Sequence, residues 1–290
     1  MKIPGKILAC FKGWKKCITP KTVILFLCLL LILPWFYNPL VVTSYSLSFA
    51  SLPSNFDGFK IAVIADLHNH RFGKNQEELI DKILEQEPDI VILAGDVLDK
   101  HSRDMTNVKN FLEGISEEFT IIAIPGNHDY LRPSVFDDLY DLYCENEVIF
   151  LDGETELIEK EGEFIVFSSA ELKPQKKGSL YSIEKSPEPE YKNEFNILLH
   201  HFGNEFDIIS DEYKLVISGH VHGGIVRLFG KGLINASKRQ PLFPKYSKGV
   251  YRKESGSVMV LSAGLGDALI PRFNNPREIV MITLKAGDAE

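Results

Sequence analysis

Five short apolar runs along this chain each end in side chains that bind divalent metal ions. The segments concerned are Asp66-Leu67-His68, Gly95-Asp96, Gly126-Asn127-His128-Asp129, His200-His201 and Gly219-His220-Val221-His222. Carboxylate, amide and imidazole groups bind hard and borderline cations, whereas structural zinc sites mostly use cysteine. No cysteine lies near any of these runs. The recurrence therefore predicts a metal centre built from oxygen and nitrogen ligands.

The first half of the body alternates strand and helix patterns. Residues 60–66, 89–95 and 119–125 are continuous apolar, β-branched runs, which are typical of strands buried on both faces. Apolar residues at helical spacing lie between them, at 79–84 and 108–115. This order predicts parallel βαβ units, in which ligands gather beyond the carboxyl ends of the strands. Gly95, Gly126 and Gly219 allow tight turns and positive φ there.

The second half contains strand patterns with little helix between them. These runs are residues 148–151, 155–159, 164–168, 196–199, 214–218, 257–262 and 279–284. They predict a second, more antiparallel sheet, and residues 42–50 can form a strand that begins the domain. The polar stretch 173–191 contains three prolines and is predicted to be a surface loop.

Charge is distributed unevenly along the 290 residues. The first 22 residues carry six lysines and no acid, whereas the whole chain has a formal net charge of −8. The body is therefore acidic and repels a phosphate backbone, so we expect no nucleic-acid polymer as a partner.

An apolar run follows the lysines and extends over residues 23–42, about one bilayer thickness at roughly 20 residues. We expect residues 1–22 to be a basic cytoplasmic segment, 23–42 a transmembrane anchor, and 43–290 a domain outside the cytoplasm of a single-pass cell-membrane protein. Trp35, Phe36 and Tyr37 suit an aromatic belt at the interface. The alternative is a cleaved signal peptide, with Ser48-Phe49-Ala50 as its cleavage site.

In order, these motifs are D-x-H, G-D-x-x-D, G-N-H-D, a lone histidine and G-H-x-H. The set resembles the calcineurin-like metallophosphoesterase superfamily over roughly residues 42–284, and it is most similar to membrane-associated bacterial phosphoesterases that continue G-H-V-H-G-G. The resemblance implies an α/β fold, a four-layer αββα sandwich with two mixed β-sheets, preceded here by one N-terminal transmembrane helix. It also implies a hydrolase of phosphomonoesters, phosphodiesters or pyrophosphates, in which a metal-activated hydroxide attacks phosphorus.

The resemblance further implies two divalent metal ions, and manganese, iron and zinc all suit such ligands. One ion would be held by Asp66, His68 and His222, the other by Asn127, His201 and His220, with Asp96 bridging both. His200 is the alternative to His201. His128 would serve the leaving group and Asp99 would orient it, although Asp99 could instead cap the next helix. Asp129 and His70 would lie behind the ligands.

The substrate is less constrained than the metal centre. Residues 227–248 hold six basic side chains together with Phe229, Phe243 and Tyr246. These side chains could bind a phosphate or a lipid headgroup. Alternatively, the segment could be a solvated loop whose aromatic residues anchor it to the core. Arg272 is a further candidate for binding a phosphate. We expect a phosphate ester as the substrate, with a lipid-linked ester and a nucleotide or wall-polymer diester as alternatives. The alternative function is a non-catalytic metal-binding scaffold module with the same fold.

Overall fold

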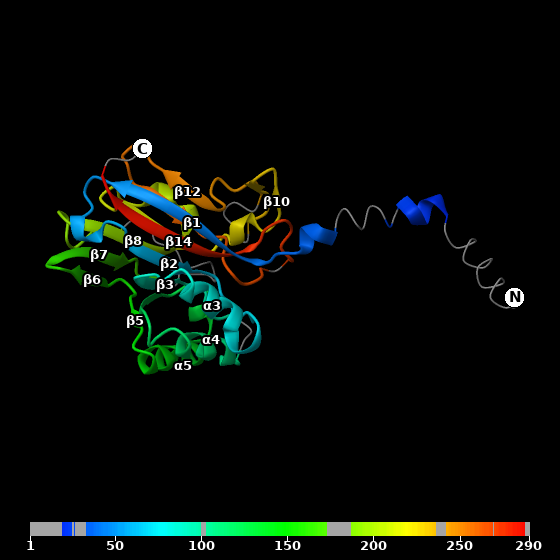
Figure 1. The fold of residues 1–290 in the computed structure, drawn as a ribbon, viewed down its shortest axis with the longest axis horizontal. Helices are drawn as coiled ribbons and strands as arrows, with labels where there is room; N and C mark the ends of the chain where they lie inside the picture. Colours follow the sequence, from blue (N-terminus) through cyan, green and yellow to red (C-terminus); the bar gives the residue numbers. More distant parts are fainter. Residues whose placement is uncertain are drawn as a thin grey trace, which may run out of the picture.

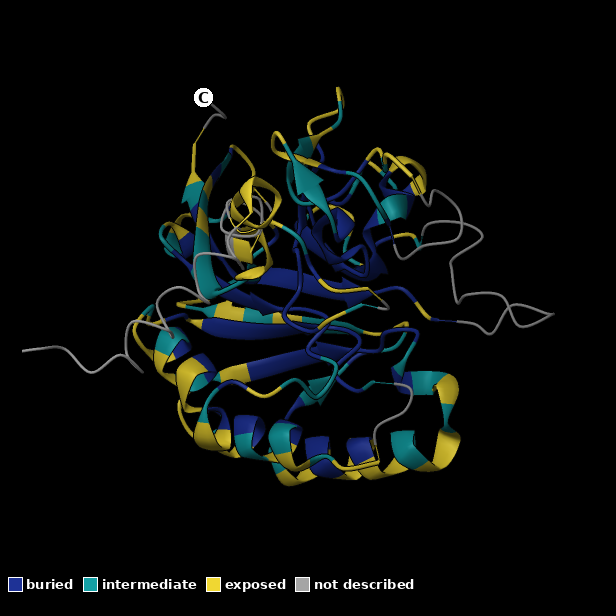
Figure 2. Cartoon of the chain, turned by 90° about the vertical axis from the view of Figure 1, so that its right-hand side faces the viewer, coloured by how far each residue is buried: buried dark blue, intermediate teal, exposed yellow. Residues whose placement is uncertain are grey.

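A computed structural model describes residues 19–24, 26, 33–99, 103–172, 187–235, 242–268 and 270–287 of the chain. Two mixed six-stranded sheets pack face to face, and three α-helices cover the outer face of the first sheet (Figures 1 and 2). In Figure 2 the helices form the lower layer, with their buried sides turned towards the sheet.

The first sheet has the strand order β1-β14-β2-β3-β4-β5. Its strands are β1 (Leu40–Phe49), β14 (Arg277–Ala286), β2 (Lys60–Ile64), β3 (Ile90–Ala94), β4 (Thr120–Ile124) and β5 (Ile149–Phe150). All neighbouring pairs are parallel except β14 with β2. The covering helices are α3 (Glu77–Leu84), α4 (Thr106–Glu113) and α5 (Pro133–Glu145). The predicted βαβ units from β2 to β4 are confirmed.

The second sheet has the order β12-β13-β9-β8-β7-β6. Its strands are β12 (Gly249–Arg252), β13 (Val258–Leu261), β9 (Leu215–Gly219), β8 (Phe195–Phe202), β7 (Glu163–Ser169) and β6 (Thr155–Lys160). The three central pairings are parallel, and only the two edge pairings are antiparallel. The expectation of a more antiparallel sheet is thus met only at its edges. The connection from β8 to β9, which the structure describes throughout, consists of the 3₁₀ turn η5 (Gly203–Ile208) and a loop. The runs at 148–151 and 279–284 form β5 and β14 and belong to the first sheet.

The remaining short elements lie in the connections. They are the 3₁₀ turns η1 (Leu33–Phe36), η2 (Ser54–Phe56), η3 (Lys74–Gln76), η4 (Asp129–Leu131), η5 (Gly203–Ile208) and η6 (His222–Gly224), and the hairpin β10 (Arg227–Leu228) and β11 (Lys231–Gly232). The part of residues 173–191 that the structure describes, from 187 onwards, contains no regular element.

Apolar side chains fill three layers. One buried cluster lies between the two sheets and a second lies between the first sheet and the three helices. A third cluster covers the outer face of the second sheet, where Phe206 of η5, Ile209 and Tyr213 pack against strand residues. Within the described residues this outer layer consists of 3₁₀ turns and loops, so the fourth layer of the expected αββα sandwich carries no α-helix there.

Residues 25 and 27–32 of the predicted anchor lie outside the described residues, as do residues 1–18 of the predicted basic segment. Among the residues that are described, no helix is long and apolar enough to cross a membrane. Leu40, Val41 and Val42 end the predicted anchor, but in the structure they form the start of β1 and pair with β14. Cleavage after Ala50 would remove this ten-residue strand from the first sheet.

Candidate metal centre

The predicted metal ligands come together at the carboxyl ends of strands from both sheets. Asp66 and His68 follow β2, Asp96 follows β3, and Asn127 follows β4. The second sheet contributes a histidine near the end of β8 and two more after β9, namely His201, His220 and His222. Because these strands are aligned and the sheets are stacked, residues separated by more than 150 positions in the sequence become neighbours.

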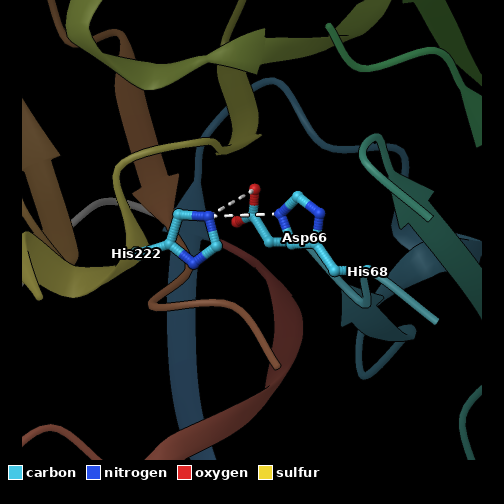
Figure 3. Close-up of side chains that lie close together, drawn as sticks. All are labelled: Asp66, His68 and His222. Carbon is cyan, nitrogen blue, oxygen red and sulfur yellow. Dashed lines mark hydrogen bonds and ion pairs between the residues drawn. The ribbon is translucent and has the colours of Figure 1, made fainter. Parts of the chain in front are cut away.

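The first group contains Asp66, His68 and His222 (Figure 3). One candidate ligand atom from each of the three lies within 4.8 Å of the others. The two imidazole Nε2 atoms are 3.2 Å apart, and His222 Nε2 is 3.8 Å from Asp66 Oδ1. Figure 3 shows the ring nitrogens and the carboxylate directed towards one point.

The second group contains Asp96, His201 and His220. His201 Nε2 lies 3.3 Å from Asp96 Oδ2, while its Nδ1–H donates to the carbonyl oxygen of Ala94 at 2.8 Å. The Asp96 carboxylate is also 3.8 Å from His68 Nε2, so it lies between the two groups. His200 faces the other way and donates to Glu205 at 3.0 Å.

Several buried polar atoms at this centre suit a cation. Within the described part of the chain, neither His220 Nε2 nor Asn127 Oδ1 has a hydrogen-bond partner. A buried polar atom without a partner is costly, so its presence requires an explanation. An imidazole nitrogen and an amide oxygen are both ligands for divalent ions, and the residues present therefore fit a metal centre.

Burial sets the protonation of most of the imidazoles. It lowers the pKa of His68 to about 4 and that of His220 to about 3, so both rings are neutral at pH 7 and keep a lone pair for a cation. Burial also opposes charge on His201, but the neighbouring Asp96 carboxylate outweighs it and raises the pKa of His201 to about 9. In return, His201 and other histidines hold the pKa of Asp96 well below its usual range despite burial.

The backbone at the centre adopts an uncommon conformation. Five of the predicted ligands have positive φ, at 47° to 77°: Asp66, His68, Asp96, His220 and His222. This left-handed region is unfavourable for residues other than glycine, and such strain persists where surrounding contacts enforce it. Here the His220 N–H donates to the Asp66 carboxylate at 3.0 Å, and the His128 N–H donates to Asp96 Oδ1 at 2.6 Å.

Of the three motif glycines, one has the expected positive φ and the other two lie against ligand carboxylates. Gly95 has φ of +85°, but Gly126 and Gly219 do not have positive φ. A Cβ atom on Gly126 would lie 2.2 Å from Asp96 Oδ1, and one on Gly219 would lie 2.9 Å from Asp66 Oδ2. These two glycines are therefore required because a ligand carboxylate packs directly against their backbone.

His128 and Asp99 lie beside the metal ligands. His128 Nδ1 is 3.6 Å from Asp99 Oδ2, and the His128 ring packs edge-on against His68 with centroids 4.7 Å apart. Asp99 is also 3.9 Å from His68 Nδ1. The alternative helix-cap role for Asp99 is not observed, because α4 begins at Thr106, whose N–H donates to Asp104.

Two further residues, Asp129 and His70, are expected from the sequence to lie near the ligands. Asp129 is buried, and its carboxylate accepts the N–H groups of Asp96, Leu98 and Gly126 at 2.8 to 3.0 Å, which joins the turn after β3 to the turn after β4. Burial raises the pKa of Asp129 to about 7. His70 lies away from both groups, 4.0 Å from Asp267.

Arg272 is buried rather than exposed to a substrate. It donates to the carbonyl oxygens of Gly264 and Gly266, and its Nη2 is 3.5 Å from His222 Nδ1. A Cβ on Gly264 would lie 2.6 Å from Asp66 Oδ2, so this turn packs tightly behind the first group. No pattern in the sequence marks Gly264, because it follows none of the ligand motifs.

Comparisons with known proteins show what this chain is similar to. The family model for calcineurin-like phosphoesterases matches residues 59–224. The uncharacterized metallophosphoesterase YkuE of Bacillus subtilis (strain 168) is 27% identical over 256 residues, covering 84% of this chain and 85% of that protein. Phosphodiesterase YaeI of Escherichia coli (strain K12) is 29% identical over 192 residues, covering 62% and 66%. Among solved structures, the Haemophilus influenzae NAD nucleotidase NadN matches with a TM-score of 0.45 and 13% identity, covering 70% of this chain and 44% of that one.

The chain belongs to the calcineurin-like phosphoesterase family, because the family model covers more than half of its residues. It is a metal-dependent phosphoester hydrolase.

Proposed function

We propose that the chain is a membrane-anchored phosphoesterase with two divalent metal ions. Asp66, His68 and His222 would hold one ion, and Asn127, His201 and His220 the other. The observation that carries this proposal is the pair of convergent ligand groups, with the Asp96 carboxylate 3.8 Å from His68 on one side and 3.3 Å from His201 on the other. A single carboxylate between two groups suits a shared ligand.

Divalent ions bound here would polarise the phosphoryl oxygens and lower the pKa of a water molecule. The chain itself supplies the groups that act on the leaving oxygen. His128 is partly exposed beside the ligands and would donate a proton to that oxygen as its bond to phosphorus breaks. Asp99 would hold the His128 ring through Nδ1, which leaves Nε2 for the substrate.

The location of the enzyme is part of the proposal. The six lysines before residue 22 and the apolar run from residue 23 support a cytoplasmic N-terminus and one membrane span. The catalytic domain would then act outside the cytoplasm at the cell membrane. A phosphate ester linked to a lipid would be the most accessible substrate at that surface, and the name of YaeI favours a phosphodiester.

The test uses the purified full-length chain, stripped of metal and reloaded separately with manganese, iron and zinc. Activity would be measured on 4-nitrophenyl phosphate and on bis(4-nitrophenyl) phosphate. We expect hydrolysis only after reloading, and faster cleavage of the diester. Hydrolysis that persists in the metal-free chain would contradict the metal-dependent mechanism, and faster cleavage of the monoester would contradict the preference for diesters.

A further inference from the structure

The tip of the β10–β11 hairpin exposes a large apolar side chain. Phe229 is 99% exposed, and it forms the two-residue turn with Gly230 between the paired residues Leu228 and Lys231. Both turn residues have positive φ, at +52° and +78°. Two-residue hairpin turns of this kind favour asparagine, aspartate or glycine, whereas a bulky aromatic residue is a conformational outlier. Neither packing nor turn preference therefore explains this phenylalanine.

A second exposed apolar pair lies alongside the hairpin. Leu242 is 62% exposed and pairs with Ile234, while Phe243 is 71% exposed and donates its N–H to the carbonyl oxygen of Leu233. Phe243 also has positive φ, at +50°. Two exposed aromatic residues are thus held in strained conformations on neighbouring segments.

The hairpin lies beside the point where the N-terminal segment joins the domain. Trp35 and Phe36 of η1 pack against Phe273, with ring centroids 5.2 and 5.1 Å apart. Phe273 in turn pairs with Val226 and accepts the N–H of Arg227, the first residue of β10. Figure 1 shows η1 and β10 at the same end of the molecule. We call the surface of Trp35, Phe36, Phe229, Leu242 and Phe243 the aromatic face.

The charge of the surrounding sequence differs from that of the rest of the chain. Residues 213–253 contain nine lysines and arginines and no acid, in a protein of net charge −8. Three of these lysines, Lys245, Lys248 and Lys253, form ion pairs with acids elsewhere in the fold. Lys231 is exposed next to the hairpin tip, and Lys238 and Arg239 lie in the same acid-free stretch.

The hairpin is also tied to the metal centre. Arg227 donates to the carbonyl oxygens of Gly223 and Gly230, and Gly223 directly follows the ligand candidate His222. The Ile234 N–H donates to Gly224, which strengthens the same connection. The hairpin tip is therefore connected through Arg227 to Gly223, the residue after the ligand candidate His222.

We propose that the aromatic face docks on the surface of an anionic phospholipid bilayer. Exposed aromatic residues beside basic side chains are the combination that partitions into the headgroup region of a membrane. The apolar N-terminal segment enters the domain at this face, which brings a bilayer to it. A second copy of the chain is disfavoured as the occupant, because two acid-free basic segments would repel each other. The proposal rests on the membrane anchor that is part of the proposed function, but it does not depend on the phosphoesterase activity.

The test places an environment-sensitive fluorophore on the full-length chain. In a background where Cys10, Cys17, Cys28 and Cys144 are serine, Phe229→Cys or Phe243→Cys is labelled and the protein is reconstituted into phosphatidylcholine vesicles with or without phosphatidylglycerol. We expect a blue shift and roughly twofold quenching by lipids that carry a quencher in the interfacial region, both stronger with phosphatidylglycerol. The control is Glu161→Cys in the β6–β7 turn, which should remain in water.

Two further measurements keep the proposal falsifiable. Phe229→Asp should withdraw the label at residue 243 from the quencher without lowering the melting temperature, since the tip is exposed. Labels at 229 and 243 that stay in water in every vesicle would overturn the proposal. Label-to-label quenching in the absence of lipid would also overturn it, because the face would then bind a second copy.

Discussion

The metal centre and the aromatic face both contain non-glycine residues with positive φ, but the two regions differ in burial. At the metal centre, Asp66, Asp96 and His220 are buried and held by hydrogen bonds from neighbouring turns. On the aromatic face, Phe229 and Phe243 are exposed. Strain that is enforced by buried contacts places ligand atoms, whereas strain at an exposed tip presents a side chain to something outside the molecule.

The largest effect is expected from Asp96→Ala. The substitution removes the carboxylate between the two ligand groups, and a loss of several kcal/mol of transition-state stabilisation corresponds to on the order of a thousandfold in kcat/KM. The measurement is hydrolysis of a nitrophenyl phosphate ester by the metal-loaded chain. Asp138→Ala, an exposed aspartate on α5, is the matched control and should retain activity. Equal activity in the two variants would show that the convergent groups are not the active centre.

His128→Ala should lower kcat by about a hundredfold to ten-thousandfold, as expected for loss of a general acid. Because a nitrophenolate leaves readily without a proton, the loss should be smaller for a nitrophenyl ester than for an alkyl ester. The metal content should stay unchanged, which separates His128 from the ligands. Equal losses on both esters would contradict a role at the leaving group.

Asp129→Ala should reduce stability more than any exposed substitution. Three buried N–H groups would lose their acceptor, and each such loss costs about 1–3 kcal/mol before relaxation. Thermal unfolding should therefore occur at a clearly lower temperature. Asp129→Asn retains one acceptor oxygen and should give an intermediate value. A melting temperature of Asp129→Ala equal to that of the native chain would mean that the turns are held by other contacts.

The smallest effect is expected at the hairpin tip. Phe229→Asn should stabilise the fold by up to about 1 kcal/mol, because asparagine tolerates the left-handed region better than phenylalanine does. Phe229→Val is the matched control and should destabilise it, since a β-branched residue is disfavoured there. A lower melting temperature for Phe229→Asn would contradict the claim that Phe229 is strained at the tip, because Phe229 would then contribute to packing.

The sequence predicted the parts of the fold that depend on local pattern. The buried runs that became β2, β3 and β4, and the metal-type residues at their ends, could be located because strand periodicity and residue chemistry coincide there. The strand pairing of the second sheet could not be predicted, because the sequence between its strands shows little helical periodicity that would mark a parallel crossover. The roles of Gly264 and Asp129 also depend on packing between segments that are far apart in the sequence.

Whether His200 or His201 is the metal ligand also depends on packing between segments that are far apart in the sequence. The two residues are adjacent, and a strand directs neighbouring side chains to opposite faces. Which face carries the metal centre depends on the stacking of the second sheet on the first, and no local pattern reveals this. The structure places His201 beside Asp96 and His200 beside Glu205.

The most direct test of the proposed centre is the number of metal ions bound per chain. Elemental analysis would be made on the native chain, on His201→Ala and on His200→Ala after reloading with manganese and removal of free metal. We predict two ions in the native chain, fewer than two in His201→Ala, and two in His200→Ala. Removal of the His200 side chain should affect only the stability of the fold. A single ion in the native chain, or loss of metal from His200→Ala with none from His201→Ala, would contradict the account.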